Sequence, residues 1–237
     1  MPNLKLVAWV RTNGFGSVRK LTKSLRGGDV TDGGIPDYPT TSEDFVARYN
    51  GPPLDEMTDE QRAIRDDIIR TRPRTGISGP FGAWLAVPEI GRPSQELGRA
   101  CRYGTTLSMR ESELIILLTG ARHKAHAEFD IHQGEALRSG LTMDIISAIP
   151  RDEEFSLERV ESDLLPLLAE SERDVAIARF TAELLKTSTI LEETYQKTLK
   201  AVGGEESVLV EITSIIGYYT YVAYTLNAFN IPFVRAK

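Results

Sequence analysis

Three histidines, all that the chain has, lie within the short stretch 122–132. On an α-helix that turns about 100° per residue, Glu128 and His132 are four positions apart and share one face. A carboxylate one turn before a histidine can fix the imidazole's tautomer and raise its basicity, so the pair can move a proton near neutral pH. His126 lies about 120° and His123 about 180° from His132, so the three histidines cannot converge from one straight helix.

The same spacing is also common in solvent-exposed helix pairs, and only an enclosed pocket around Glu128 and His132 would favour chemistry. A metal is not expected, because Glu-x-x-x-His lacks a third ligand and the chain has neither HExxH nor a cysteine cluster. Gly14 and Gly16 form a lone G-x-G, which is no nucleotide-binding fingerprint. No GxSxG context supports a serine nucleophile.

Helical signals begin near residue 42 and continue to the end of the chain. Thr58 with Gln61 and Ser108 with Glu111 are capping-box patterns, each of which predicts a helix start. The apolar residues that follow Glu111 recur at helical spacing and should face a core. We expect helices over 42–49, 58–72, 94–103, 124–139, 142–149, 171–186, 191–202 and 205–227, and a further helix that starts at Ser108 and includes the apolar residues 114–118.

Residues 1–40 contain many glycines and prolines, which indicate an irregular N-terminal arm with at most a short strand at 5–11. Residues 41–237 then form one helical domain, and no convincing sheet is predicted. The fold class is therefore all-α, a helical bundle preceded by an arm.

The formal net charge of -6 in 237 residues argues against nucleic acid or an anionic membrane as the main partner. One cysteine, Cys101, permits no internal disulfide and suits a reducing compartment. No apolar run reaches the roughly 20 residues of a membrane-spanning helix. A cytoplasmic location is expected, although the basic residues before Asp29 leave an organellar leader in 1–28 open.

From Glu128 onward the chain reads Glu128-Phe129-x-x-His132, followed by Ala136, Gly140 and Leu141. This order resembles the E-[WF]-x-x-H-x-x-x-A-x-x-x-G-L signature of the carboxymuconolactone decarboxylase family. Upstream, Arg110-Glu111 or Glu113-Leu114 resembles that family's R-E-L helix start. Further similarity to a longer branch of the family extends over about residues 50–234, in the stretches 54–72, 79–81, 217–220 and 226–229.

The resemblance implies an alkylhydroperoxidase-D-like helical fold that assembles as a homo-oligomer, a dimer, trimer or hexamer, with sites near subunit interfaces. It also implies that no cofactor is needed, that His132 is the general acid, and that Glu128 orients it or shares its proton.

The related alkylhydroperoxidase-D branch carries E-x-x-C-x-x-C-x-x-x-H. Counted back from His132, its two cysteine positions are Glu128 and Ala125 here, and its glutamate position is Arg122. A thiol peroxidase needs a nucleophilic thiolate and a resolving partner, which Cys101 alone cannot supply.

The leading hypothesis is a cofactor-independent decarboxylase, or a related proton-transfer lyase, acting on a small carboxylated lactone or carbonyl compound. His132 would deliver the proton and Glu128 would orient it. Arg122 or Arg110 could anchor a carboxylate, since a guanidinium binds one through two hydrogen bonds. The remaining predicted substrate-binding residues are His126, Phe81, Phe129 and Tyr218, with Tyr219 beside it.

Two alternatives stay open. One is an isomerase or cyclase of a biosynthetic pathway that uses the same pocket. The other is a non-catalytic oligomeric binding protein in which the pair is structural.

Overall fold

The computed structural model describes residues 30–31, 35–36, 47–72, 76–151 and 154–232. The chain forms two compact units, Met1–Tyr38 and Pro39–Lys237. In the first unit the described residues are a short antiparallel pair, β1 (Val30–Thr31) and β2 (Ile35–Pro36). The strand predicted at 5–11 lies outside the described residues.

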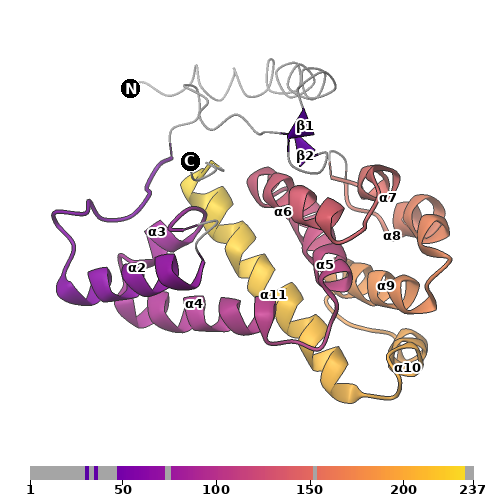
Figure 1. Cartoon of the computed structure of the whole chain (residues 1–237). Helices are drawn as coiled ribbons and strands as arrows, with labels where there is room; N and C mark the ends of the chain where they lie inside the picture. Colours follow the sequence, from indigo (N-terminus) through magenta and orange to yellow (C-terminus); the bar gives the residue numbers. More distant parts are fainter. Residues whose placement is uncertain (1–29, 32–34, 37–46, 73–75, 152–153, 233–237) are drawn as a thin grey trace. The chain divides into compact units, whose positions relative to one another are not determined.

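The described part of the second unit is helical (Figure 1), which confirms the all-α fold class. Its elements in chain order are α2 (Asp59–Thr71), α3 (Phe81–Trp84), α4 (Pro88–Tyr103), α5 (Met109–Arg122), α6 (His126–Arg138), α7 (Met143–Ala148), α8 (Leu157–Arg159), the π-helical turn η1 (Val160–Leu164), the 3-10 turn η2 (Leu165–Leu168), α9 (Glu172–Thr187), α10 (Glu192–Ala201) and α11 (Glu206–Phe229). None of the described helices is long and apolar enough to cross a bilayer.

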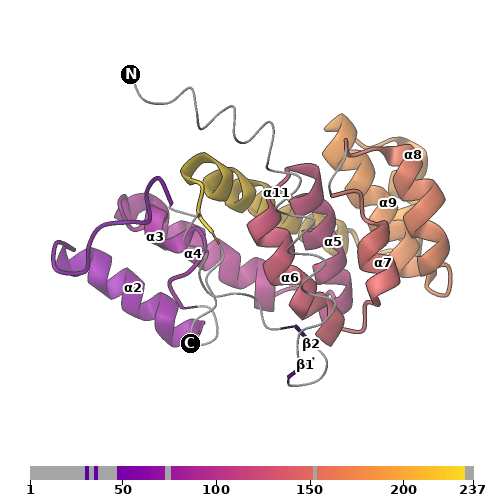
Figure 2. The same ribbon diagram turned by 90° about the horizontal axis from the view of Figure 1, so that it is seen from above.

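Helix α5 is the centre of this unit. It packs against α6, α9 and α11 (Figure 2), and the run from Leu114 to Leu118 is buried on every side of the helix. A helix covered from all directions has no polar face to give to solvent, which explains its continuous apolar sequence. One charged residue, Glu113, lies in this interior with none of its surface exposed.

Local capping signals position several of the helices. Both predicted capping boxes are confirmed, with Thr58 and Gln61 opening α2 and Ser108 and Glu111 opening α5. The Thr142 side chain accepts a hydrogen bond from the amide of Ile145 and so caps α7, without the reciprocal bond of a capping box. These contacts satisfy amides that the first helical turn leaves without partners.

Three predicted elements differ from the structure. Residues 47–49 are not helical, although a helix was expected over 42–49; residues 42–46 lie outside the described part. Helix α4 begins at Pro88 rather than at residue 94, because proline at a first helical position needs no amide hydrogen bond. Residues 157–168 form short helical turns where none was predicted, since their irregular geometry leaves no clear period.

Truncation of the central helix should be costly. We expect Leu117→Ala to lower the free energy of unfolding by about 2–5 kcal/mol, because Leu117 is fully buried and its removal leaves a cavity. Val210→Ala is the matched control: Val210 is 65% exposed and its truncation should cost less than about 0.5 kcal/mol. Urea denaturation followed by circular dichroism measures both, and equal costs would contradict the central position of α5.

Candidate active site

His132 lies between two carboxylates inside the helical unit. Its Nδ1 atom is 2.8 Å from Oε2 of Glu113 on α5, and its Nε2 atom is 3.1 Å from Oε1 of Glu128, one turn earlier on α6. The exposed fractions of Glu113, Glu128 and His132 are 0%, 4% and 7%. The Glu128–His132 pair is therefore buried, and it has a third member that comes from the central helix.

A buried arginine extends this chain of charges. Arg102, on α4, forms an ion pair with the other carboxylate oxygen of Glu113, and its Nη2 atom lies 3.8 Å from Oε2 of Glu135. The order Arg102, Glu113, His132, Glu128 thus alternates positive and negative charge when the imidazole is protonated. Because an unpaired charge in a protein interior costs several kcal/mol, each member stabilises its neighbours in the ionised form.

The pKa values follow from this arrangement. Burial alone would lower the pKa of His132, but the carboxylates of Glu113 and Glu128 outweigh it and raise the pKa to about 9. Burial opposes ionisation of Glu113 as well, yet His132 and Arg102 hold the pKa of Glu113 below its usual range. Near neutral pH the histidine is an imidazolium, and both ring nitrogens donate to carboxylates.

A cavity of about 140 Å³ opens beside the pair. Glu128 and His132 line one part of it, and Phe81, Tyr218 and Arg72 are among its other lining residues. Cavities of roughly 150 Å³ hold a single six-membered ring, so the site suits a small molecule of that size.

Two tyrosines of α11 bring their rings to this cavity. The ring of Tyr219 meets the ring of His132 edge-on, with centroids 5.2 Å apart, and Tyr218 packs edge-on against Tyr219 at the same separation. Burial raises the pKa of both phenols, so both keep their protons. Within the described residues neither hydroxyl has a hydrogen-bond partner, which leaves two donors for a ligand.

The other histidines do not join the site. His123 Nε2 lies 3.1 Å from the Thr220 hydroxyl. His126 Nδ1 lies 3.5 Å from Nη2 of Arg151, whose guanidinium covers the ring of Phe129 at 4.4 Å. Neither His126 nor Phe129 lines the cavity, because the first turn of α6 directs both toward the loop after α7 rather than toward α11. In the described residues no group of three or more potential ligands is arranged to hold a metal ion.

The two arginines proposed as anchors also lie elsewhere. Arg122 donates through Nε to the carbonyl of Leu185 on α9, and Arg110 pairs with Asp174 at 2.7 Å. Both side chains contact α9, and neither lines the cavity. Their guanidinium groups therefore hold helices together.

Sequence reasoning missed three charged residues of the site: Arg72, Arg102 and Glu113. Glu113 precedes His132 by 19 positions and Arg102 lies on another helix, so no helical period connects them. The one available signal was Glu113 itself, a carboxylate at the start of a strongly apolar run.

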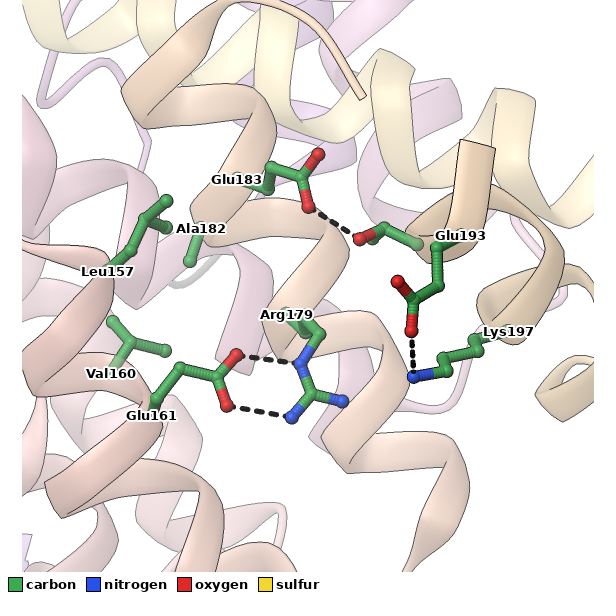
Figure 3. Close-up of a pocket in the computed structure, with 9 residues that line it drawn as sticks. Leu157, Val160, Glu161, Arg179, Ala182, Glu183, Glu193 and Lys197 are labelled. Carbon is green, nitrogen blue, oxygen red and sulfur yellow. Dashed lines mark hydrogen bonds and ion pairs between the residues drawn. The ribbon is translucent and has the colours of Figure 1, made fainter. Parts of the chain in front are cut away.

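A second and larger cavity, of about 310 Å³, lies between η1, α9 and α10 (Figure 3). Both carboxylate oxygens of Glu161 pair with Arg179 at 2.7 Å, and Glu193 pairs with Lys197 at 2.6 Å. The third carboxylate, Glu183, accepts hydrogen bonds from the start of α10. Each of its charged groups is thus paired or hydrogen-bonded within the protein, and this cavity offers no reactive group comparable to the buried histidine.

No protein-family model matches the chain, and no curated protein matches it. Among solved structures, the chain is similar to an uncharacterized peroxidase-related protein from Silicibacter sp. TM1040. The TM-score is 0.58 at 14% sequence identity, over 78% of this chain and 90% of that chain. The chain has an alkylhydroperoxidase-like fold. At this identity the likeness is one of fold alone, and the chemistry must come from the residues.

Within this alkylhydroperoxidase-like fold, the ionised His132 should make stability depend on pH. Its pKa rises from about 6.5 unfolded to about 9 folded, so its contribution is fully present below pH 6.5 and disappears as pH rises through about 9. We expect the wild-type free energy of unfolding to fall across that window. His132→Asn should weaken the pH dependence of the free energy of unfolding, which chemical denaturation at a series of pH values measures. The same pH dependence in wild type and variant would contradict the ionised histidine.

Proposed function

We propose that this chain is a cofactor-independent decarboxylase, or a related proton-transfer lyase, acting on a small carboxylated lactone or carbonyl compound. One observation carries the proposal: the buried imidazole of His132 and its partner Glu128 both line a ring-sized cavity. A buried acid–base pair with a raised pKa in a cavity is typical of general acid–base catalysis.

The chemistry can be written in balanced steps. The bond between the carboxyl carbon and its neighbour breaks, carbon dioxide leaves, and the electron pair moves into the conjugated carbonyl to form an enolate. Because both ring nitrogens of His132 face carboxylates, the proton travels by relay: the Nε2 proton moves to Glu128, and the acid so formed protonates the enolate carbon. Solvent then returns a proton to His132.

Tyr219 is placed to stabilise the enolate. Its hydroxyl is a protonated donor without a hydrogen-bond partner among the described residues, and its ring contacts the ring of His132. A fixed donor at an oxygen that gains negative charge lowers the barrier because it needs no reorganisation during the reaction.

A thiol peroxidase is the function that the structural neighbour's description would suggest, and the residues do not favour it. The chain's one cysteine, Cys101, is buried, and burial raises the pKa of its thiol. Peroxide reduction by thiols needs an accessible thiolate and a second thiol to resolve the product. An isomerase or cyclase would use the same proton relay without loss of carbon dioxide.

The test compares wild type with Glu128→Gln and His132→Asn on a panel of carboxylated lactones and β-keto acids. We expect wild type to release carbon dioxide and both variants to be slower by about 10²–10⁴-fold, the usual contribution of a positioned acid. Asp130→Asn, on the same helix but outside the cavity, is the matched control and should keep its activity. Circular dichroism checks folding.

The outcomes separate the candidate functions. Solvent deuterium entering a compound without carbon dioxide release, and only with Glu128 and His132 intact, would replace the decarboxylase by an isomerase or cyclase. Equal activity in wild type and both variants would contradict the proposed relay. Neither release nor exchange from any compound would favour a binding protein in which the pair is structural.

A further inference from the structure

Arg72 is a buried cation beside the cavity of His132. It is 7% exposed and lines the same cavity as the histidine. Its Nη1 donates to Oε1 of Gln95 at 2.8 Å, and its Nη2 donates to the carbonyl of Gln95 at 3.0 Å. Within the described part of the chain no carboxylate lies at ion-pairing distance from it.

This arrangement is unusual because an arginine cannot lose its charge in a protein. A buried guanidinium without an anion is strongly unfavourable unless a ligand supplies the missing charge. The neighbours of Arg72 fix its direction but do not neutralise it: Gln95 is itself held by a 2.6 Å hydrogen bond to Asp67, and the ring of Phe81 lies 4.8 Å from the guanidinium carbon.

Tyr218 supplies a second donor near Arg72. Its hydroxyl has no protein partner among the described residues, and the charge of Arg72 acts on it. The hydroxyl passes directly over Gly98 of α4, where an added Cβ atom would lie only 2.1 Å from the phenol oxygen. Glycine at this position is therefore what allows Tyr218 to reach its place beside the cavity.

We propose that Arg72 and Tyr218 together bind a carboxylate of the ligand, as an anchor separate from the Glu128–His132 relay. A guanidinium with free N–H groups and a phenol are complementary to the two oxygens of a carboxylate. Glu128, at the relay, carries the opposite charge from Arg72, so a carboxylate that is to be retained binds more tightly at the Arg72 end of the cavity.

The proposed function gives this anchor its chemical meaning. A carboxylate stabilised by a guanidinium keeps its electrons on oxygen, so the anchored group is the one retained through the reaction. For a decarboxylase the substrate then carries two carboxyl groups. One is retained at Arg72, and the other leaves as carbon dioxide from the reacting carbon at the Glu128 end of the cavity.

Binding of benzoate and of benzamide tests the anchor, since the two have one ring and nearly the same shape but differ in charge. We expect wild type to bind benzoate roughly 10- to 100-fold more tightly, the range of hydrogen bonds to charged groups. Arg72→Gln should abolish that preference, and Arg72→Lys should keep part of it. Arg92→Gln, an exposed arginine on α4 that pairs with Glu60, is the matched control and should change nothing.

Tyr218→Phe keeps the guanidinium and should weaken benzoate binding by roughly 10-fold or more, the value of one hydrogen bond to a charged group. It also keeps the test valid if Arg72→Gln fails to fold. Equal affinity of wild type for the two probes, an unchanged preference in Arg72→Gln, or no binding of either probe at millimolar concentration would overturn the anchor.

The anchor and the proposed function can fail separately. Glu128→Gln should lose turnover and keep the preference for benzoate. A preference for benzoate without turnover of any compound would leave the anchor standing and contradict the lyase. Turnover by wild type with no preference for benzoate over benzamide would support the lyase and contradict the anchor.

Discussion

The imidazolium of His132, held between Glu113 and Glu128, is the interaction on which the rest of the site depends. None of these groups would be stable in the interior alone, since an unpaired buried charge is costly. Arg102, on α4, forms an ion pair with Glu113 and so balances the second of the two carboxylates. Three helices are thereby tied to one electrostatic network, and correct packing of α4, α5 and α6 is also the condition for a charged histidine.

The network explains why the central helix carries a carboxylate in an otherwise apolar sequence. Glu113 is as deeply buried as its leucine neighbours, yet its two oxygens face one cation each, Arg102 and His132. A hydrophobic residue at this position would pack as well, but it would leave Arg102 with only the more distant Glu135 and His132 with only Glu128. Glu113 therefore stabilises the charged site, although an apolar side chain at this position would be easier to bury.

Charge in the cavity is distributed unevenly. The relay of His132 and Glu128 lies on α6, whereas Arg72 follows the end of α2 and contacts Gln95 on α4. Tyr218, from α11, completes the lining. A small molecule with a retained anionic group at one end and a reacting carbon at the other matches this arrangement, because each end contacts a different kind of side chain.

The sequence was informative where the physics is local. Capping boxes such as Ser108 with Glu111 fix helix starts within a few residues, and the four-residue spacing of Glu128 and His132 places them on one face. The contacts between residues on different helices depend on how the helices pack. Glu113 reaches His132 only because α5 lies against α6, and no single-helix pattern encodes that contact.

The same limit explains the misplaced anchors. Arg122 is close to the relay in sequence, yet its helix turns it toward α9, where it donates to Leu185. Arg72 is remote in sequence and lies next to the cavity through the packing of α2 on α4. Distance along the sequence did not predict which arginines line the cavity, because the fold brings together helices that are far apart in the sequence.

The most direct test of the account is the protonation state of His132, read from the NMR shifts of its two ring nitrogens as pH is raised. The His132→Asn variant assigns the signals by their absence. The account predicts that both nitrogens stay protonated through neutral pH and that the ring titrates near pH 9. A neutral ring with one bare nitrogen at pH 7 would contradict it, because the carboxylates would then not hold an imidazolium.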